Sequence, residues 1–177
     1  PRRYFFEQIA GVFAESGRSV PIFNDKHFAY DFGDAQWMWD RARELDIPLM
    51  AGSSLPLCWR SPYVEYAKDT PVEEALSIGY GGIEAYGYHA LETLQCMVER
   101  RRGGETGVVS VQCLEGDEVW RAGDDGRWSR ELAGAAIDAV ANKPDGRMED
   151  HTKDPAVFLV EYADELKAAT LMLSGYV

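Results

Sequence analysis

The stretch that decides the fold is Val20-Pro21-Ile22-Phe23-Asn24-Asp25-Lys26-His27, a short apolar run that passes directly into polar residues. An amphipathic segment, 34–45, follows it, and a second apolar run, 48–51, is closed by Gly52. Two short apolar strands joined by a helix are typical of a parallel βαβ unit. Because ligands bind at the carboxyl ends of the strands in such sheets, segments 24–27 and 52–54 are candidate site material.

The segments on either side of this unit complete an α/β pattern. Apolar residues at three- and four-residue spacing predict a helix with a stripe of Phe5, Phe6, Ile9, Val12 and Phe13, stopped by Gly17. Three prolines in 56–72 indicate a domain boundary. Beyond it the pattern predicts a strand at 74–79 and a helix at 83–102 with Tyr86 and Leu94 in its core stripe. A β-rich run at 108–114, a helix at 127–141 and a loop at 142–154 follow, and an antiparallel hairpin is predicted over 157–177. Asp34 is the predicted cap of the helix at 34–45.

Composition excludes several classes of protein. Of the 177 residues, 46% are hydrophobic and 27% charged, a soluble globular balance with no run near the roughly 18 apolar residues of a membrane helix. The net charge of −12 repels phosphate backbones, so we expect neither a nucleic acid nor a membrane as partner. Cys58, Cys96 and Cys113 form no CxxC pair, which favours buried thiols in a reducing, cytoplasmic compartment over a disulfide framework or a zinc site.

Both ends of the chain suggest that it is cut from a longer protein. It opens Pro1-Arg2-Arg3 without an initiator Met and without the pattern of a signal peptide. It closes on an apolar run, 171–177, that is typical of a strand.

His89 has the chemistry of a proton-transfer residue. On the predicted helix at 83–102, Ala85, Glu92 and Cys96 share its face at α-helical spacing. An imidazole can exchange a proton near neutral pH, and Glu92 is near enough in sequence to orient it. The alternative is a hydrogen-bonded histidine at a domain interface.

Lys26 is the second candidate. A lysine after a strand can donate to a substrate hydroxyl or carbonyl, or it can pair with Asp25 on a solvated surface. Asp25, Lys26 and His27 are too tightly spaced and too poor in acceptors for a metal site.

The remaining polar motifs are weaker signals. Ser53 follows a strand without the G-x-S-x-G context of a hydrolase elbow. Arg60, next to Trp59, lies in a loop that either lines a cleft or simply packs. The basic run 100–102 precedes two glycines, which favours helix termination over a phosphate site.

Taken in order, these features resemble the glucose-fructose oxidoreductase/inositol dehydrogenase (Gfo/Idh/MocA) family. Asp25-Lys26-His27 stands where that family has Glu-Lys-Pro after a strand. The segment Gly81 to Glu92 is similar to the family's glycine-rich entry followed by Asp-x-Gly-x-His-x-x-Asp, with Gly87 and His89 matching and Glu92 replacing the last acid. The resemblance covers most of the chain and implies an α/β fold: the C-terminal part of a Rossmann-type domain over 1–55, and an α+β domain with a largely antiparallel sheet over 56–177.

The resemblance also implies an activity. Proteins of this family are NAD- or NADP-dependent oxidoreductases that act on sugars, cyclitols or related alcohols, and they commonly form homo-oligomers through the sheet. Carried over, Lys26 and His89 are the catalytic residues, and Asp25 and Lys26 contact the cofactor. Five polar residues near these two segments are expected to contact the small polyol or sugar-like substrate: His27, Ser53, Arg60, Glu84 and Glu92.

Three departures from the family pattern favour alternatives. The acid expected four residues before His89 is Ala85, the Pro after the lysine is His27, and no G-x-G-x-x-G occurs in the 177 residues. By itself, therefore, the chain is not expected to bind a dinucleotide well. A non-catalytic ligand-binding or assembly protein on the same fold is the first alternative. A hydrolase or lyase that uses His89 with Glu84 or Glu92 is the second, although no nucleophile accompanies them.

Overall fold

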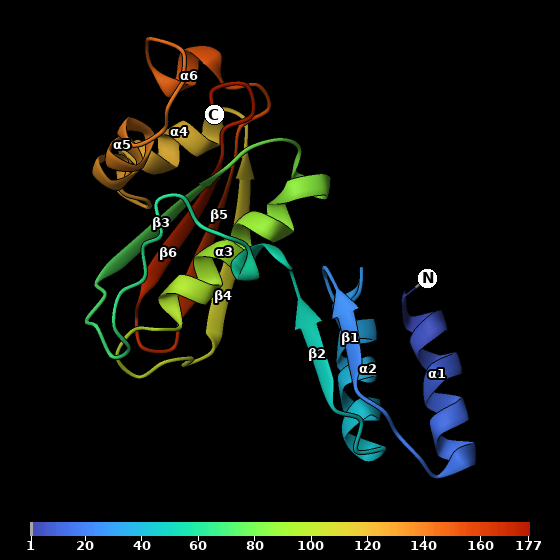
Figure 1. The fold of residues 1–177 in the computed structure, drawn as a ribbon. Helices are drawn as coiled ribbons and strands as arrows, with labels where there is room; N and C mark the ends of the chain where they lie inside the picture. Colours follow the sequence, from blue (N-terminus) through green and yellow to red (C-terminus); the bar gives the residue numbers. More distant parts are fainter. Residues whose placement is uncertain (1) are drawn as a thin grey trace. The chain divides into compact units, whose positions relative to one another are not determined.

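The computed structural model describes residues 2–177 and divides into two compact units between Ser54 and Leu55. In the first unit the order of elements is α1 (Arg2–Ser16), β1 (Ile22–Asp25), α2 (Phe32–Glu44) and β2 (Leu49–Gly52) (Figure 1). β1 and β2 pair in parallel, with Ile22 opposite Leu49 and Asp25 opposite Gly52. The predicted parallel βαβ unit is confirmed.

The core of this unit lies where α1 and α2 pack together. Its buried members are apolar residues from both helices and the loop before β2: Phe6, Ala10, Met38, Ala42 and Ile47. The predicted stripe of α1 was partly wrong, because the helix packs through Phe6 and Ala10 while Phe5 and Val12 are more than 60% exposed. The predicted cap of α2 was wrong too: Asp31 caps the helix, and its side chain accepts from the amide of Asp34 at 3.2 Å.

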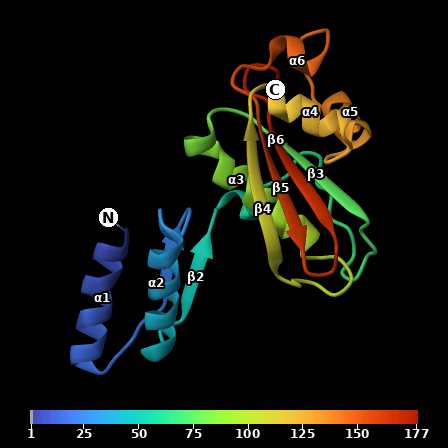
Figure 2. The ribbon, with the colours of Figure 1, turned by 180° about the vertical axis from the view of Figure 1, so that it is seen from behind.

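The second unit is built on a four-stranded mixed sheet in the order β3-β6-β5-β4 (Figure 2). The strands are β3 (Glu74–Gly79), β4 (Val108–Glu115), β5 (Ala156–Tyr162) and β6 (Lys167–Met172). β4, β5 and β6 pair antiparallel as predicted, whereas β3 runs parallel to β6. The sheet is therefore largely antiparallel, with one parallel strand at its edge.

Two clusters of buried residues alternate along β5 and β6, so helices cover both faces of this sheet. On one face α3 (Tyr88–Val98) packs Leu94 and Val98 against Val160 and Tyr162. On the other, α4 (Asp117–Asp124) and α5 (Arg130–Asp138) pack against Val157, Ala169 and Leu171 around the buried indole of Trp128. The unit also contains a short 3-10 helix, η1 (Leu55–Leu57), and α6 (Met148–His151).

The helix predicted over 83–102 differs most from the structure. It begins as a π-helical turn, η2 (Ile83–Gly87), continues as α3 and ends at Val98. A π turn bonds i to i+5 and holds one residue more than an α turn, so α-helical spacing does not carry across it. The buried positions are therefore Gly87, Leu94 and Val98, and Tyr86 is 41% exposed instead of lying in the core.

Two further expectations need correction. The segments at 117–124 and 148–151 are helical although no helix was predicted there. Cys58 and Cys113 are exposed rather than buried, because Cys58 follows η1 and Cys113 lies on the edge strand β4. Within residues 2–177, no helix combines the length and the apolar character that crossing a bilayer requires.

Candidate functional site

The ends of β1 and β2 are tied together in the first unit. The amide of Lys26 donates to the carbonyl of Gly52 at 2.9 Å, which extends the contact of the two strands by one residue. Ser53, the next residue after β2, is 6% exposed. The structure therefore brings two predicted site segments, 24–27 and 52–54, to one edge of the two-stranded sheet.

Lys26 has a backbone conformation that lysine rarely adopts. Its φ is +70°, in the left-handed region, which costs a residue with a Cβ roughly 1–2 kcal/mol. Such residues cluster at functional sites, where the surrounding structure holds them in place. Its ammonium lies 3.4 Å from Asp25 Oδ2, and both side chains are about half exposed. An ion pair this exposed is weak, so Lys26 can exchange Asp25 for a ligand at little cost.

The loop that carries Lys26 is held by residues on both sides of it. Arg2 on α1 donates from Nη1 to the carbonyl of Asp25 at 2.7 Å and to Asn24 Oδ1 at 3.4 Å. Asn24 in turn donates from Nδ2 to the carbonyl of His27 at 3.3 Å. Sequence reasoning missed the role of Arg2, because no local pattern relates residues 22 or 23 positions apart.

His89 is the second residue of α3, directly after the π turn. Within α3 the α-helical spacing holds, so Glu92 and Cys96 share its face as predicted, and His89 and Glu92 are both half-buried. The ring of Tyr88 lies 6.2 Å from the imidazole, centroid to centroid. Ala85 and the exposed Glu84 belong to the π turn that precedes α3, so a face shared by Ala85 and His89 stays a prediction.

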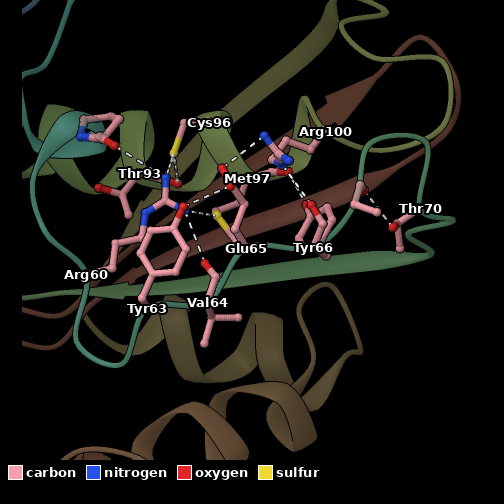
Figure 3. A network of polar contacts seen from close by, with 12 residues as sticks. Arg60, Tyr63, Val64, Glu65, Tyr66, Thr70, Thr93, Cys96, Met97 and Arg100 are labelled. Atoms are coloured by element: carbon pink, nitrogen blue, oxygen red, sulfur yellow. Dashed lines mark hydrogen bonds and ion pairs between the residues drawn. The ribbon is translucent and has the colours of Figure 1, made fainter.

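Arg60 binds its own loop to the same helix (Figure 3). Its Nη1 lies 3.2 Å from Met97 Sδ and donates to the carbonyl of Val64 at 3.3 Å. Its Nη2 lies 3.7 Å from Cys96 Sγ, on the helix face that carries His89 and Glu92. Burial raises the pKa of the Cys96 thiol, and the charge of Arg60 opposes this. The guanidinium is thus used to pack the loop, and a substrate contact by Arg60 stays a prediction.

The basic run after α3 has a structural role that the sequence showed only in part. Arg101 is 2% exposed and donates to the carbonyl of Val98 at 2.9 Å, which is the predicted helix termination. It also forms two hydrogen bonds with the carboxylate of Asp164, at 2.8 and 2.9 Å, in the turn between β5 and β6. The hydrogen bonds from Arg101, followed by the one from Thr106, hold the pKa of Asp164 well below its usual range.

Three further features bear on function. Residues 2–177 contain no group of three His, Cys, Asp or Glu side chains placed to hold a metal ion. His151 stacks on Tyr176 at 5.8 Å, and its Nε2 lies 2.8 Å from the carbonyl of Asp145. A cavity of about 340 Å³ on the α4–α5 side of the sheet is lined by Gln112, Arg127 and Lys167 among others, and contains none of the predicted site residues.

Comparison with known proteins identifies similarity to a solved structure. No family model matches the chain, and no curated protein sequence matches it. The structure is similar to the crystal structure of a "putative dehydrogenase" from Bordetella bronchiseptica RB50, with a TM-score of 0.50 and 13% sequence identity. The match covers 97% of this chain and 42% of that protein, so the chain spans less than half its length. At this level of identity, the likeness shows that the chain shares an α/β fold with that dehydrogenase-like protein.

Proposed function

We propose that this chain is part of a nicotinamide-dependent oxidoreductase of the Gfo/Idh/MocA type, which acts on a sugar, a cyclitol or a related alcohol. The observation that carries the proposal is the left-handed backbone of Lys26 at the carboxyl ends of two parallel strands. This is the edge at which α/β sheets bind ligands, and a lysine held there in a strained backbone conformation supports a functional position. The fold shared with a protein named as a dehydrogenase supports the same class.

The residues present fit one end of a nicotinamide dinucleotide. The half-exposed ammonium of Lys26 and the carboxylate of Asp25 can contact the nicotinamide end. No glycine-rich loop for the pyrophosphate occurs in the sequence, so the proposal assigns only the nicotinamide end to this chain. When bound, the nicotinamide would accept or supply the hydride.

The side chains of this chain would handle the proton and the reacting oxygen. Lys26 would donate a hydrogen bond from its ammonium to the oxygen that changes between hydroxyl and carbonyl. His89 would take the hydroxyl proton during oxidation and return it during reduction, with Glu92 on the same helix face to orient the imidazole. His27, Ser53, Arg60 and Glu84 remain candidate substrate contacts.

One observation favours the non-catalytic alternative. Ala85 stands where the family has an acid, so the carboxylate expected four residues before His89 is absent. A ligand-binding protein on this fold would retain the strained Lys26 and bind the substrate without hydride transfer. The two functions differ in turnover, because a ligand-binding protein transfers no hydride even as wild type. The variants described next are therefore assayed for turnover and, separately, for stability.

Replacing Lys26 by glycine should raise stability while it removes activity. Glycine relieves the left-handed strain but loses more backbone entropy, so the free energy of unfolding should rise by up to about 1 kcal/mol. Lys26→Ala keeps the strain and should leave stability within about 0.5 kcal/mol of wild type. Loss of the ammonium should lower kcat/KM for sugar or cyclitol oxidation roughly 100-fold or more in both variants. The assays use the protein encoded by the complete reading frame, with NAD+ and NADP+.

Asp46 provides a matched control in the same unit. Its φ is +49° and it is exposed in the loop between α2 and the start of β2, away from the carboxyl ends of the strands. Asp46→Gly should gain similar stability and keep full turnover. Normal turnover in both Lys26 variants would contradict the role assigned to Lys26.

A further inference from the structure

Two tyrosine rings lie together on the surface where β3 passes into η2. Tyr80 directly follows β3 and is 58% exposed, and Tyr86 lies in the π turn and is 41% exposed. Their ring centroids are 5.0 Å apart and their planes meet at 36°. Tyrosine rings that serve only the core are buried, as Tyr162 is, so this pair calls for another account.

Three glycines fix the backbone around this pair. A Cβ on Gly79 would lie 2.8 Å from both Ala90 Cβ and Met172 Sδ, and one on Gly87 would lie 3.2 Å from Phe158. These two positions therefore bring the start of the helical segment close to the sheet, as only glycine allows. Gly81 has a φ of +76°, and a Cβ there would lie 2.5 Å from Tyr86 Cδ2, so the ring of Tyr86 rests on the Gly81 backbone.

The pair is thus an exposed aromatic surface on a tightly packed support, at the same end of the helical segment as His89. Tyr86 precedes His89 by three residues. An aromatic face carries partial negative charge, which attracts C–H groups, and each phenol adds a hydrogen-bonding hydroxyl at the rim. Glu84, exposed in the same turn, disfavours anions.

We propose that Tyr80 and Tyr86 form a stacking platform for the ring of a neutral cyclic polyol, such as a pyranose or a cyclitol. Such a ring presents a face of C–H bonds to the aromatic rings and its hydroxyl groups to their rims. The proposal rests on the proposed function, because it names the substrate class that His89 would serve. It selects a ring over an open-chain polyol, and an uncharged sugar over a sugar phosphate or sugar acid.

Saturation-transfer NMR on the protein encoded by the complete reading frame tests the platform without requiring turnover. The ligands are methyl β-D-glucopyranoside, myo-inositol, glucose 6-phosphate and open-chain sorbitol, each with and without NADH. We expect at least one of the two neutral rings to receive saturation at its ring C–H protons, and sorbitol and the phosphate to receive little. Tyr80→Ala and Tyr86→Ala should each weaken binding roughly fivefold, and Tyr86→Phe should keep most of it.

Tyr63→Ala is the matched control, because Tyr63 is also an exposed tyrosine of the second unit, at 65%. This variant should bind the neutral rings as the wild type does. Unchanged binding in both platform variants, equal saturation of sorbitol, or no saturation of either neutral ring overturns the proposal. Ring binding that needs the tyrosines but gives no hydride transfer supports the platform and contradicts the oxidoreductase. Hydride transfer that is unchanged in both alanine variants supports the oxidoreductase and contradicts the platform.

Discussion

Replacing Arg101 by methionine will lower the free energy of unfolding by about 3 kcal/mol, because a buried side chain loses its charge-assisted hydrogen bonds to the exposed carboxylate of Asp164. The guanidinium is almost fully buried and binds Asp164 through Nε and Nη2. It also lies 4.6 Å from the centroid of the Tyr162 ring, and its third contact is the last carbonyl of α3. It therefore joins α3 to the β5–β6 turn, and methionine can replace only the apolar stem of the side chain.

Arg102→Met is the control, since Arg102 is exposed and should change stability by less than about 0.5 kcal/mol. Acid gives a second readout from urea unfolding curves. Folding lowers the pKa of Asp164, so the stabilisation is fully present above the unfolded carboxyl pKa of about 3.9 and is lost as the pH falls toward the folded value. The stability difference between wild type and Arg101→Met should therefore shrink below about pH 4. Equal unfolding curves at neutral pH would contradict the role of Arg101.

Trp128→Ala will have a comparable effect in the other core of the second unit. The indole is 2% exposed, and its Nε1 donates to the carbonyl of Val119 at 2.9 Å. A Cβ on Gly123 would lie 2.4 Å from Trp128 Cζ2, so the ring lies directly against the backbone of α4. Truncation leaves a large cavity and removes the hydrogen bond from the indole, and we expect a loss of about 4 kcal/mol in thermal or urea unfolding.

Trp59 offers a control of the same residue type in the same unit. It is 94% exposed, so Trp59→Ala should change the free energy of unfolding by less than about 0.5 kcal/mol. If the two tryptophan variants unfold alike, the packing of α4 and α5 on the sheet is not as described.

The sequence predicted those parts of the fold that depend on local patterns. The βαβ unit and the β5–β6 hairpin follow from short apolar runs separated by polar residues, and both are found. The strand expected over 171–177 was wrong beyond its start, because β6 ends at Met172 and the chain then turns. The parallel pairing of β3 with β6 joins residues such as Glu74 and Lys167, which no local pattern connects. For the same reason Arg101 was interpreted only as a helix terminator, since its partner Asp164 lies 63 residues further on.

The candidate site, too, was predictable from the sequence only in part. The position of Lys26 after a strand was evident in the sequence, but its left-handed backbone was not, because lysine is not a residue that favours that region. The π turn was hidden as well, since α-helical periodicity places Tyr86 in the core. The glycines at 79, 81, 82 and 87 were the available signal, because so many in one helix entry indicate close packing or an irregular turn.

The most direct test of the proposed oxidoreductase is hydride transfer from a panel of sugars and cyclitols, followed by the absorbance of the reduced nicotinamide. The protein encoded by the complete reading frame is assayed as wild type, His89→Gln and His151→Gln. We predict turnover by the wild type, a fall of roughly 100-fold or more in His89→Gln, and a rate within about twofold of wild type in His151→Gln. No reduced nicotinamide from the wild type with NAD+ or NADP+, or a full rate in His89→Gln, would contradict the account.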